Sequence, residues 1–343
     1  MFYVPGMMKR LDAAFYTRAF ERGLARAMAN AARLSSAHRQ SPANRQSSIP
    51  NHQLIEAHFV WPDGVGAWRV ARNTGIPFVC TIRGKLVSQI ADPSKRRLIR
   101  QMLRDADALI AVSQSLANLA NEVAGRDLGV RVIPNGVDTQ MFRRFGKTGH
   151  GSSEDARYVI SVGHIQELKG FHRLVEIWPE VRQRAGDVRL RLVGGAAGEP
   201  AYERRLRRQI DGSGLGPCEG PSGAVTLLGR RRPDEIAELL NAADLFVLAS
   251  RSEGWNNAIV EALACGCPVV ATDVGGNREI VNDPALGSLA LLGDRAALTK
   301  EICRALARDW DREAIAAVGG QRDWQQVALE CVDVFKSVLS AKA

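Results

Sequence analysis

The 343-residue sequence predicts an α/β protein of two doubly wound parallel-sheet domains that face each other over a cleft. Short segments rich in Val, Ile and Leu alternate with amphipathic segments, which is typical of parallel sheets covered by helices on both faces. The length suits two domains of ordinary size. Residues 139–156, which mix glycine, serine and charge without periodicity, separate the two series as a linker does. Ligands of such folds gather at the carboxyl ends of the strands.

The apolar segments give ten expected strands, four in a first domain at 1–138 and six in a second at 157–320. In order, they are 54–58, 77–82, 108–113, 130–136, 158–163, 189–195, 225–229, 245–250, 268–274 and 288–293. The remaining residues, 321–343, place Trp324, Val327, Ala328, Cys331 and Phe335 at helical spacing, which favours a packing face over a functional site.

The composition, 45% hydrophobic and 24% charged, is that of a soluble globular protein. No apolar run reaches the length of a membrane span and the first residues lack a signal-peptide core, so we expect the chain in the cytoplasm. The six cysteines and six histidines are scattered without metal-ligand spacing. We therefore expect reduced cysteines and no metal site.

Positive charge is concentrated in the first half. Residues 1–150 carry 22 Lys and Arg against 10 Asp and Glu, whereas the remainder carries 24 against 27. Such a surface attracts anionic lipid, a phosphorylated substrate or nucleic acid, although a merely solvated basic surface is an equal alternative. Because the aromatic residues of a nucleic-acid platform are missing, we expect no nucleic-acid partner and peripheral association with an anionic membrane surface instead.

The most informative stretch is SRSEGWNNAIVEALACGCPVVATDVGG, residues 250–276. A strand ends at its start, Asn256 or Asn257 can cap the following helix, and Gly266 can end it. The free N–H groups and the dipole at this helix start favour an anion, and a diphosphate suits such a site.

Two glutamates flank that helix start. Glu253 precedes it, and Glu261 lies about 7 Å further along the helix axis from Asn256. An ionised carboxylate accepts hydrogen bonds at two oxygens, so it suits the vicinal hydroxyls of sugars. A nucleotide sugar offers a ribose diol, a diphosphate and a hexose in that order. A mid-helix glutamate such as Glu261, taken alone, is usually a solvated surface residue.

The spacing of these glutamates resembles the E-x7-E signature of the family 4 retaining glycosyltransferases, two-domain enzymes with the GT-B fold of two Rossmann-like domains. The resemblance covers nearly everything from residue 54 onward. It is carried in the second half by VGHIQELKGFHRLVEIW, VTLLGRRRPDEIAELLNAADLFVLASRSEGW and GCPVVATDVGGNREIV, and in the first by AHFVWPDGVGAW, PFVCTIRG, AVSQSL and VIPNGVDTQMF.

This resemblance implies roles for matching positions only. Glu253 would hold hydroxyls of the donor sugar, Glu261 the ribose diol, and Lys169 would neutralise the diphosphate. Arg83 stands where the family has a donor-contacting histidine, and we count it with Glu253 as catalytic. The remaining expected donor contacts are Gly163, His164, Leu228, Arg230, Gly254, Trp255, Asn256 and Asn257.

The sequence departs from the family pattern at three places. His164 replaces an arginine, which weakens the expected grip on the diphosphate because a neutral imidazole cannot make a two-pronged phosphate contact. Lys85 and Leu86 replace a small polar residue and an acid. No strand or glycine-rich loop is visible before Leu54, so we expect a first domain with a shortened start. The last helix is expected to cross back to the first domain, as it often does in the family.

The resemblance implies a retaining, metal-independent hexosyltransferase without a cofactor. It would move a sugar from a UDP or GDP sugar to a glycan or lipid-linked acceptor in exopolysaccharide or cell-envelope synthesis. The main alternative is a truncated, inactive nucleotide-sugar-binding remnant or partner subunit. A sugar-nucleotide epimerase of similar fold is a further alternative. A glycosidase is disfavoured, since hydrolases rarely need a phosphate site at a helix start.

Overall fold

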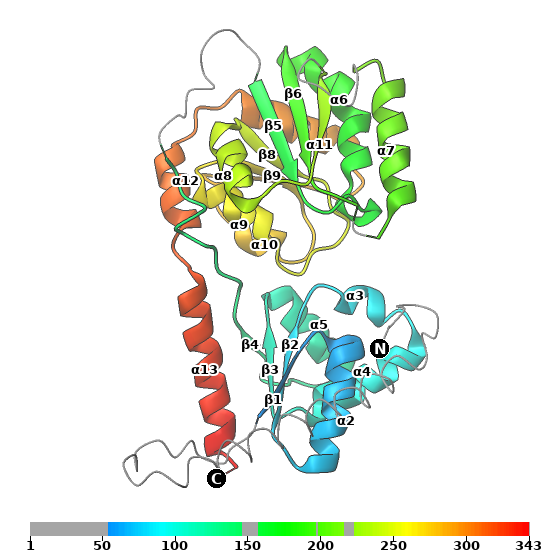
Figure 1. Ribbon diagram of the computed structural model, residues 1–343, viewed down its shortest axis with the longest axis vertical. Helices are drawn as coiled ribbons and strands as arrows, with labels where there is room; N and C mark the ends of the chain where they lie inside the picture. The colour runs from blue at the N-terminus through cyan, green and yellow to red at the C-terminus, as the bar shows by residue number, and fades with distance from the viewer. Residues whose placement is uncertain (1–53, 146–156, 197, 216–222, 343) are drawn as a thin grey trace, which may run out of the picture. The chain divides into compact units, whose positions relative to one another are not determined.

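The computed structural model describes residues 54–145, 157–196, 198–215 and 223–342. By its internal contacts the chain divides into a first unit, Met1–Ile133 with Leu329–Ala343, and a second unit, Pro134–Ala328. Figure 1 shows both units. The predicted shortened start falls in 1–53 and lies outside the described residues.

The first unit contains a parallel sheet in the order β1-β2-β3-β4. Its strands are β1 (Ile55–His58), β2 (Phe78–Ile82), β3 (Ala108–Ala111) and β4 (Arg131–Val132). Between them lie a π-helical turn (Val60–Gly64) and helices α2 (Val65–Thr74), α3 (Leu86–Gln89), α4 (Pro93–Asp105) and α5 (Gln114–Ala124). Because each strand is added on the same side of the last and crossovers are right-handed, α2, α4 and α5 share one face of the sheet.

Local sequence explains where these helices begin and end. Asp92 caps α4 by accepting the Ser94 N–H at 2.9 Å, and Pro93 occupies the first helical position. Ser113 caps α5, which ends at Gly125 in the left-handed conformation. The last helix, α13 (Trp324–Ser340), joins the first unit from Leu329 onward, and Lys342 after it pairs with Asp107 at 2.7 Å.

The second unit contains a six-stranded parallel sheet in the order β10-β9-β8-β5-β6-β7. The strands are β5 (Arg157–Val162), β6 (Val188–Val193), β7 (Val225–Gly229), β8 (Leu245–Leu248), β9 (Val269–Thr272) and β10 (Gly287–Ala290). The helices are a short 3₁₀ turn (Glu167–Lys169), α6 (Phe171–Ala185), α7 (Pro200–Gly212), α8 (Pro233–Ala242), α9 (Asn257–Ala264), α10 (Asn277–Ile280), α11 (Arg295–Leu306) and α12 (Arg312–Gly319). The strand order reverses between β5 and β8, and such a switch point opens a crevice for ligands.

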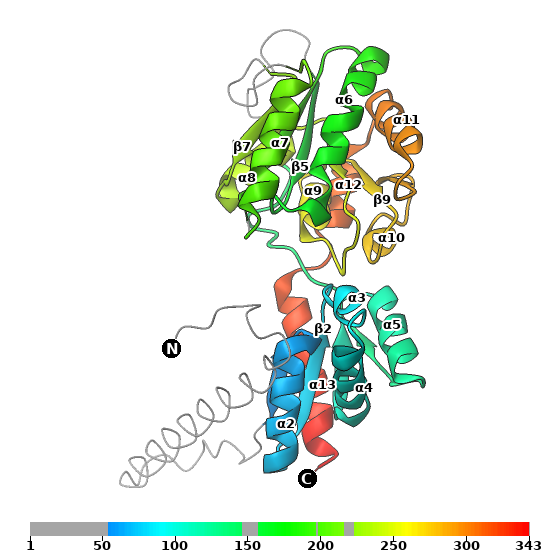
Figure 2. The same cartoon turned by 90° about the vertical axis from the view of Figure 1, so that its right-hand side faces the viewer.

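Both faces of this second sheet are buried under helices, as Figures 1 and 2 show. On one face Val159 of β5 packs in the same apolar cluster as Trp178 of α6, which is fully buried. On the other face its neighbour Ile160 packs with Leu240 of α8 and Ile259 of α9. Successive side chains of the strand point to opposite faces of the sheet, and both faces are apolar. The strand sequences are therefore continuous runs of Val, Ile and Leu.

The predicted fold class of two parallel-sheet α/β domains is confirmed, and each of the ten predicted segments overlaps a strand. Within the described ranges, no helix combines the length and apolarity needed to cross a bilayer.

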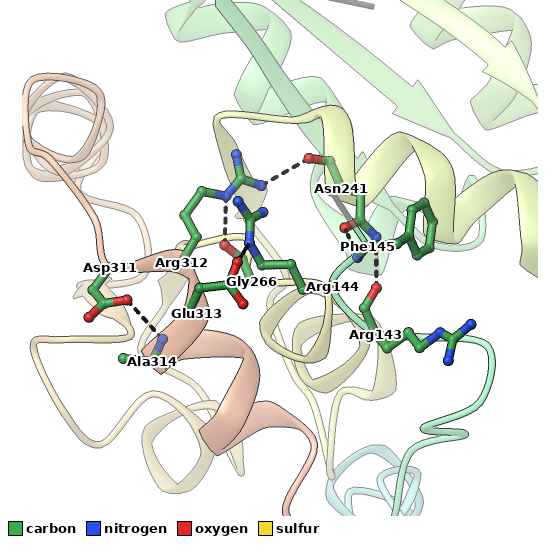
Figure 3. Close-up of polar contacts among 9 residues, drawn as sticks. All are labelled: Arg143, Arg144, Phe145, Asn241, Gly266, Asp311, Arg312, Glu313 and Ala314. Atoms are coloured by element: carbon green, nitrogen blue, oxygen red, sulfur yellow. Dashed lines mark hydrogen bonds and ion pairs between the residues drawn. The ribbon is translucent and has the colours of Figure 1, made fainter. Parts of the chain in front are cut away.

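Part of the predicted linker is described, and it packs against the second unit (Figure 3). The Asn241 side chain accepts the Phe145 N–H at 3.2 Å and donates to the Arg143 carbonyl at 3.0 Å. Arg144 pairs with Glu313 of α12, and the Arg312 guanidinium donates to the carbonyls of Gly266 and Asn241. These contacts attach residues 143–145 and the start of α12 to the carboxyl ends of α8 and α9.

Candidate functional site

The candidate site lies in the second unit, where the loops after β5 and β8 meet at the switch point. The backbone N–H of Arg251 donates to the Leu168 carbonyl at 2.8 Å and ties the two loops together. Gly170 follows the 3₁₀ turn in the left-handed conformation, and a side-chain carbon there would lie 2.0 Å from the Ala249 carbonyl oxygen. Only glycine permits this approach, which brings the neighbouring Lys169 to the end of β8.

Lys169 and Glu253 form an ion pair across these loops. The lysine Nζ lies 2.7 and 3.0 Å from the two carboxylate oxygens. The side chains are only 19% and 8% exposed, so the pair is screened from water far more than a surface salt bridge. The structure thus joins the predicted diphosphate cation and the predicted sugar-binding carboxylate directly.

Two glycines hold this region together through close backbone approach. A side-chain carbon on Gly275 would lie 1.8 Å from the Glu253 carbonyl oxygen, and one on Gly194 would lie 1.8 Å from that of Gly163. Their sequence pairs, 194–195 and 275–276, could equally have been plain turns. The sequence carries no signal that distinguishes a turn glycine from one pressed against a distant loop.

The helix start has the geometry that the sequence predicts. Asn256 caps α9 and its side chain accepts the Ile259 N–H at 3.2 Å, while Gly266, just past the helix, is left-handed. The backbone N–H groups of Gly254, Trp255 and Asn256 donate to no described group. These N–H groups can therefore donate hydrogen bonds to an anion bound at the positive end of the α9 dipole.

Asn135 supports the first residue of α9 from 122 positions away in the chain. Its side-chain amide, itself buried, donates to the Asn257 side-chain oxygen at 2.9 Å. Asn135 and Gly136 suggested a turn in the sequence, and nothing local indicated this contact.

Glu261 lies one turn into α9 and forms no hydrogen bond or ion pair with a residue that the structure describes. Burial of its carboxyl raises the pKa to about 7 from an ordinary value of 4.5. A carboxylate that is partly removed from water without a partner is costly, and a pair of ligand hydroxyl groups would supply hydrogen-bond donors to it.

The other predicted residues of the second unit lie at the same end of the sheet. Gly163 and His164 follow β5, and the His164 side chain is exposed. Leu228 and Arg230 lie at the end of β7, beside Gly194, whose N–H donates to the Gly229 carbonyl at 2.9 Å. Among all the predicted side chains of this unit, only Lys169 and Glu253 bond directly to each other within the described structure.

Arg83 belongs to the first unit and follows β2. Its Nε donates to His58 Nδ1 at 3.3 Å, and His58 Nε2 lies 3.3 Å from a Glu56 oxygen that also accepts from Thr81. The predicted contact of Arg83 with the donor stays a prediction.

No three His, Cys, Asp or Glu side chains of the described ranges are grouped so that they could hold a metal ion.

Comparison with known proteins gives a consistent family. Residues 156–308 match the family model described as Glycosyl transferases group 1, and residues 11–141 match that described as Glycosyltransferase Family 4. The chain is 28% identical over 310 residues to the D-inositol 3-phosphate glycosyltransferase of Segniliparus rotundus, a match that covers 85% of this chain and 68% of the relative. It is 26% identical over 263 residues to the N-acetyl-alpha-D-glucosaminyl L-malate synthase of Bacillus anthracis, covering 75% and 66%.

Solved structures agree on the fold. Sucrose-phosphate synthase from Thermosynechococcus elongatus superposes with a TM-score of 0.76 at 22% identity, over 99% of this chain and 81% of that one. The Anabaena protein Alr3699/HepE, solved in complex with UDP, superposes with a TM-score of 0.71 at 26% identity, over 83% and 79%. Both support the predicted GT-B class.

Proposed function

The chain belongs to the family 4, group 1 glycosyl transferases, and from this premise we propose that it transfers a hexose from a UDP or GDP sugar to a hydroxyl group with retention of configuration. The proposed acceptor is a glycan or a lipid-linked saccharide of exopolysaccharide or cell-envelope synthesis. Besides donor and acceptor, the proposed reaction requires no metal and no cofactor. An anionic membrane surface, met by the basic first half, is part of the proposal.

The observation that carries the proposal is the arrangement around the start of α9. Free backbone N–H groups at Gly254, Trp255 and Asn256 suit a diphosphate, and the Lys169 ammonium lies within bonding distance of Glu253 beside them. The Glu261 carboxyl, which has no partner among the described residues, lies one turn further on. Together these groups match the charge and hydroxyl sequence of a nucleotide sugar.

We assign a separate role to each group. Glu261 accepts from the ribose hydroxyls, and the α9 start with Lys169 stabilises the diphosphate as it leaves, so that no metal ion is needed. Glu253 accepts from hydroxyls of the transferred sugar. The nucleobase lies near Leu228 and Arg230, and His164 adds a weaker contact to the phosphates. Arg83 contacts the donor from the first unit.

In the proposed reaction the bond between the sugar anomeric carbon and the diphosphate oxygen breaks, and the acceptor oxygen bonds to the same face of the sugar. The acceptor hydroxyl gives its proton to a phosphate oxygen of the departing diphosphate. Retention and this route rest on the family resemblance. The contribution of the chain is electrostatic, because the α9 N–H groups and Lys169 stabilise the negative charge that develops on the leaving group.

The relatives favour a second kind of acceptor. Two of them are named for D-inositol 3-phosphate and L-malate, which are small anionic hydroxyl compounds. The basic first half is equally compatible with such a molecule, because Coulomb attraction does not distinguish a soluble anion from a lipid headgroup. The acceptor panel must therefore contain both.

The test is nucleotide release from UDP, GDP and ADP sugars. Each donor is incubated alone, with a membrane extract, and with D-inositol 3-phosphate or L-malate, and Glu253→Ala serves as the control. We expect acceptor-dependent release from one donor and none from the variant. If the protein binds UDP or GDP tightly but no acceptor raises the release rate, the transferase proposal is wrong. The alternative of an inactive nucleotide-sugar-binding remnant then replaces it.

A further inference from the structure

We propose that the arginine face of α4 is a docking surface for anionic phospholipid headgroups. This face consists of Arg96, Arg97, Arg100 and Arg104 of α4 with Arg126, which follows α5. The inference rests on the proposed function, because a surface that binds lipid headgroups would bring the protein to a lipid-linked acceptor.

The arginines lie on the solvent side of α4, opposite its buried face. Ile99, Met102 and Leu103 are at most 1% exposed, whereas the five arginines are all exposed. Arg96, Arg100 and Arg104 follow one another at four-residue spacing, so they are neighbours in one row about 12 Å long. Arg97 lies beside this row, three residues from Arg100.

Several guanidinium groups converge at the carboxyl end of α5. A side-chain carbon placed on Gly125 would lie 3.3 Å from Nη2 of Arg100 and 3.5 Å from Nη2 of Arg104. Arg104 Nε donates to the Ala124 carbonyl at 2.7 Å, and Arg126 Nη2 donates to the Arg104 carbonyl at 2.9 Å. Carbonyl oxygens at a helix end hold these cations in place but carry no full negative charge.

The positive charge of the face is not neutralised within the described first unit. The acids at the two ends of α4 are engaged elsewhere: Asp92, just before the helix, caps it, and Asp105, its last residue, lies 3.9 Å from Arg72. Arg96, Arg97 and Arg100 form no ion pair with any residue that the structure describes. Like charges at four-residue spacing repel, so this arrangement costs stability unless an external anion compensates it.

Helix α7 of the second unit shows the usual alternative. It also carries four arginines, but Arg205 pairs with Glu167 at 3.0 Å and Arg207 with Glu203 at 2.9 Å. Alternating charge of this kind describes a solvated helix. The α4 face instead presents one sign of charge and no aromatic side chain on which a base could stack, which favours a lipid surface over nucleic acid.

The test is binding of the full chain to vesicles of phosphatidylcholine with and without phosphatidylglycerol. The variant is Arg96→Gln/Arg97→Gln/Arg100→Gln, which removes three unpaired cations and leaves no buried group unsatisfied. The matched control is Arg204→Gln/Arg208→Gln/Lys300→Gln, which removes three exposed cations from the second unit. Circular dichroism and UDP binding verify that each variant is folded.

We expect the chain to bind only the anionic vesicles, and salt should weaken this binding. The α4 variant should lose roughly 100-fold in vesicle affinity, because it lacks three positive charges that would lie near the anionic surface. The vesicle affinity of the control variant should stay within about threefold of that of the unmodified chain, because charges far from the lipid surface are screened and contribute little. Equal loss in both variants, no loss in the α4 variant, or tighter binding to an oligonucleotide than to the vesicles would overturn the proposal. UDP binding without vesicle binding would overturn this inference and the membrane contact of the proposed function but leave the proposed sugar transfer standing, whereas vesicle binding without turnover of any donor would overturn only the proposed sugar transfer.

Discussion

Glu261→Gln is expected to stabilise the ligand-free protein at alkaline pH. Burial raises the pKa of the Glu261 carboxyl to about 7 from an ordinary 4.5, so the folded chain holds its proton more tightly than the unfolded chain. Stability from this carboxyl is therefore fully present below about pH 4.5 and is lost as the pH rises towards 7 and beyond. Glutamine keeps the shape of the protonated acid and has no charge to desolvate.

The magnitude follows from that raised pKa. Between about pH 5 and 8.5 the wild-type chain should lose about 2 kcal/mol relative to the variant, after allowance for the part of the carboxyl that water still reaches. For a unit of this size, 1 kcal/mol moves the melting temperature by roughly 2–4 °C. Scanning calorimetry of the two proteins should then show a difference that grows by roughly 4–8 °C across this pH range.

The same substitution should have the opposite effect on ligand binding. UDP affinity is expected to fall by about 1–3 kcal/mol, the scale for losing a hydrogen bond to a charged acceptor. The control is Glu238→Gln on α8, an exposed glutamate of the same unit. A melting difference that does not change with pH, or that appears equally in the control, would refute the desolvation argument. Unchanged affinity for both UDP and GDP would refute the ribose role.

Three further predictions concern the same loops. Glu253→Gln should not weaken UDP binding, because it removes the carboxylate that competes with the diphosphate for Lys169, but it should lower the transfer rate about 100-fold, the scale for a group that acts on the transition state; equal loss of UDP affinity and transfer rate in calorimetry and rate assays would contradict the assigned role. Gly275→Ala should abolish transfer, since its new carbon would lie 1.8 Å from the Glu253 carbonyl oxygen. Gly293→Ala, left-handed but in open space, should cost only about 1 kcal/mol and keep activity. His164→Arg should tighten UDP binding about tenfold through a two-pronged phosphate contact; unchanged affinity would show that the exposed His164 lies away from the phosphates.

The sequence predicts the fold well because local patterns decide it. The runs at 158–163 and 245–250 are strands, β5 and β8, whose side chains are buried on both faces of the sheet. The cap of α9 by Asn256 and its end at Gly266 follow from the chemistry of single residues, and both are confirmed. Glu261 could be chosen only because the family signature outweighed its ordinary position within a helix.

The sequence does not reveal which loops touch. The contact of Asn135 with Asn257 and the approach of Gly275 to Glu253 join residues far apart in the chain, and their side-chain types occur in many turns. The Lys169–Glu253 pair was also missed, although both residues were chosen, because the sequence assigned them to different parts of one ligand. The path of the backbone through the switch point decides these contacts, and periodicity carries no information about it.

The Lys169–Glu253 ion pair also determines what an arriving ligand must do. Its carboxylate accepts from the ammonium at both oxygens, so the two opposite charges compensate each other within the protein. A diphosphate that binds the lysine competes with a carboxylate of the same sign, and weakening this ion pair is a cost that lowers affinity for any single anion such as free phosphate. A donor that brings phosphate for the lysine and hydroxyl groups for the released glutamate compensates both partners at once. Selectivity for a whole nucleotide sugar over its fragments is thus a property of this exchange of partners.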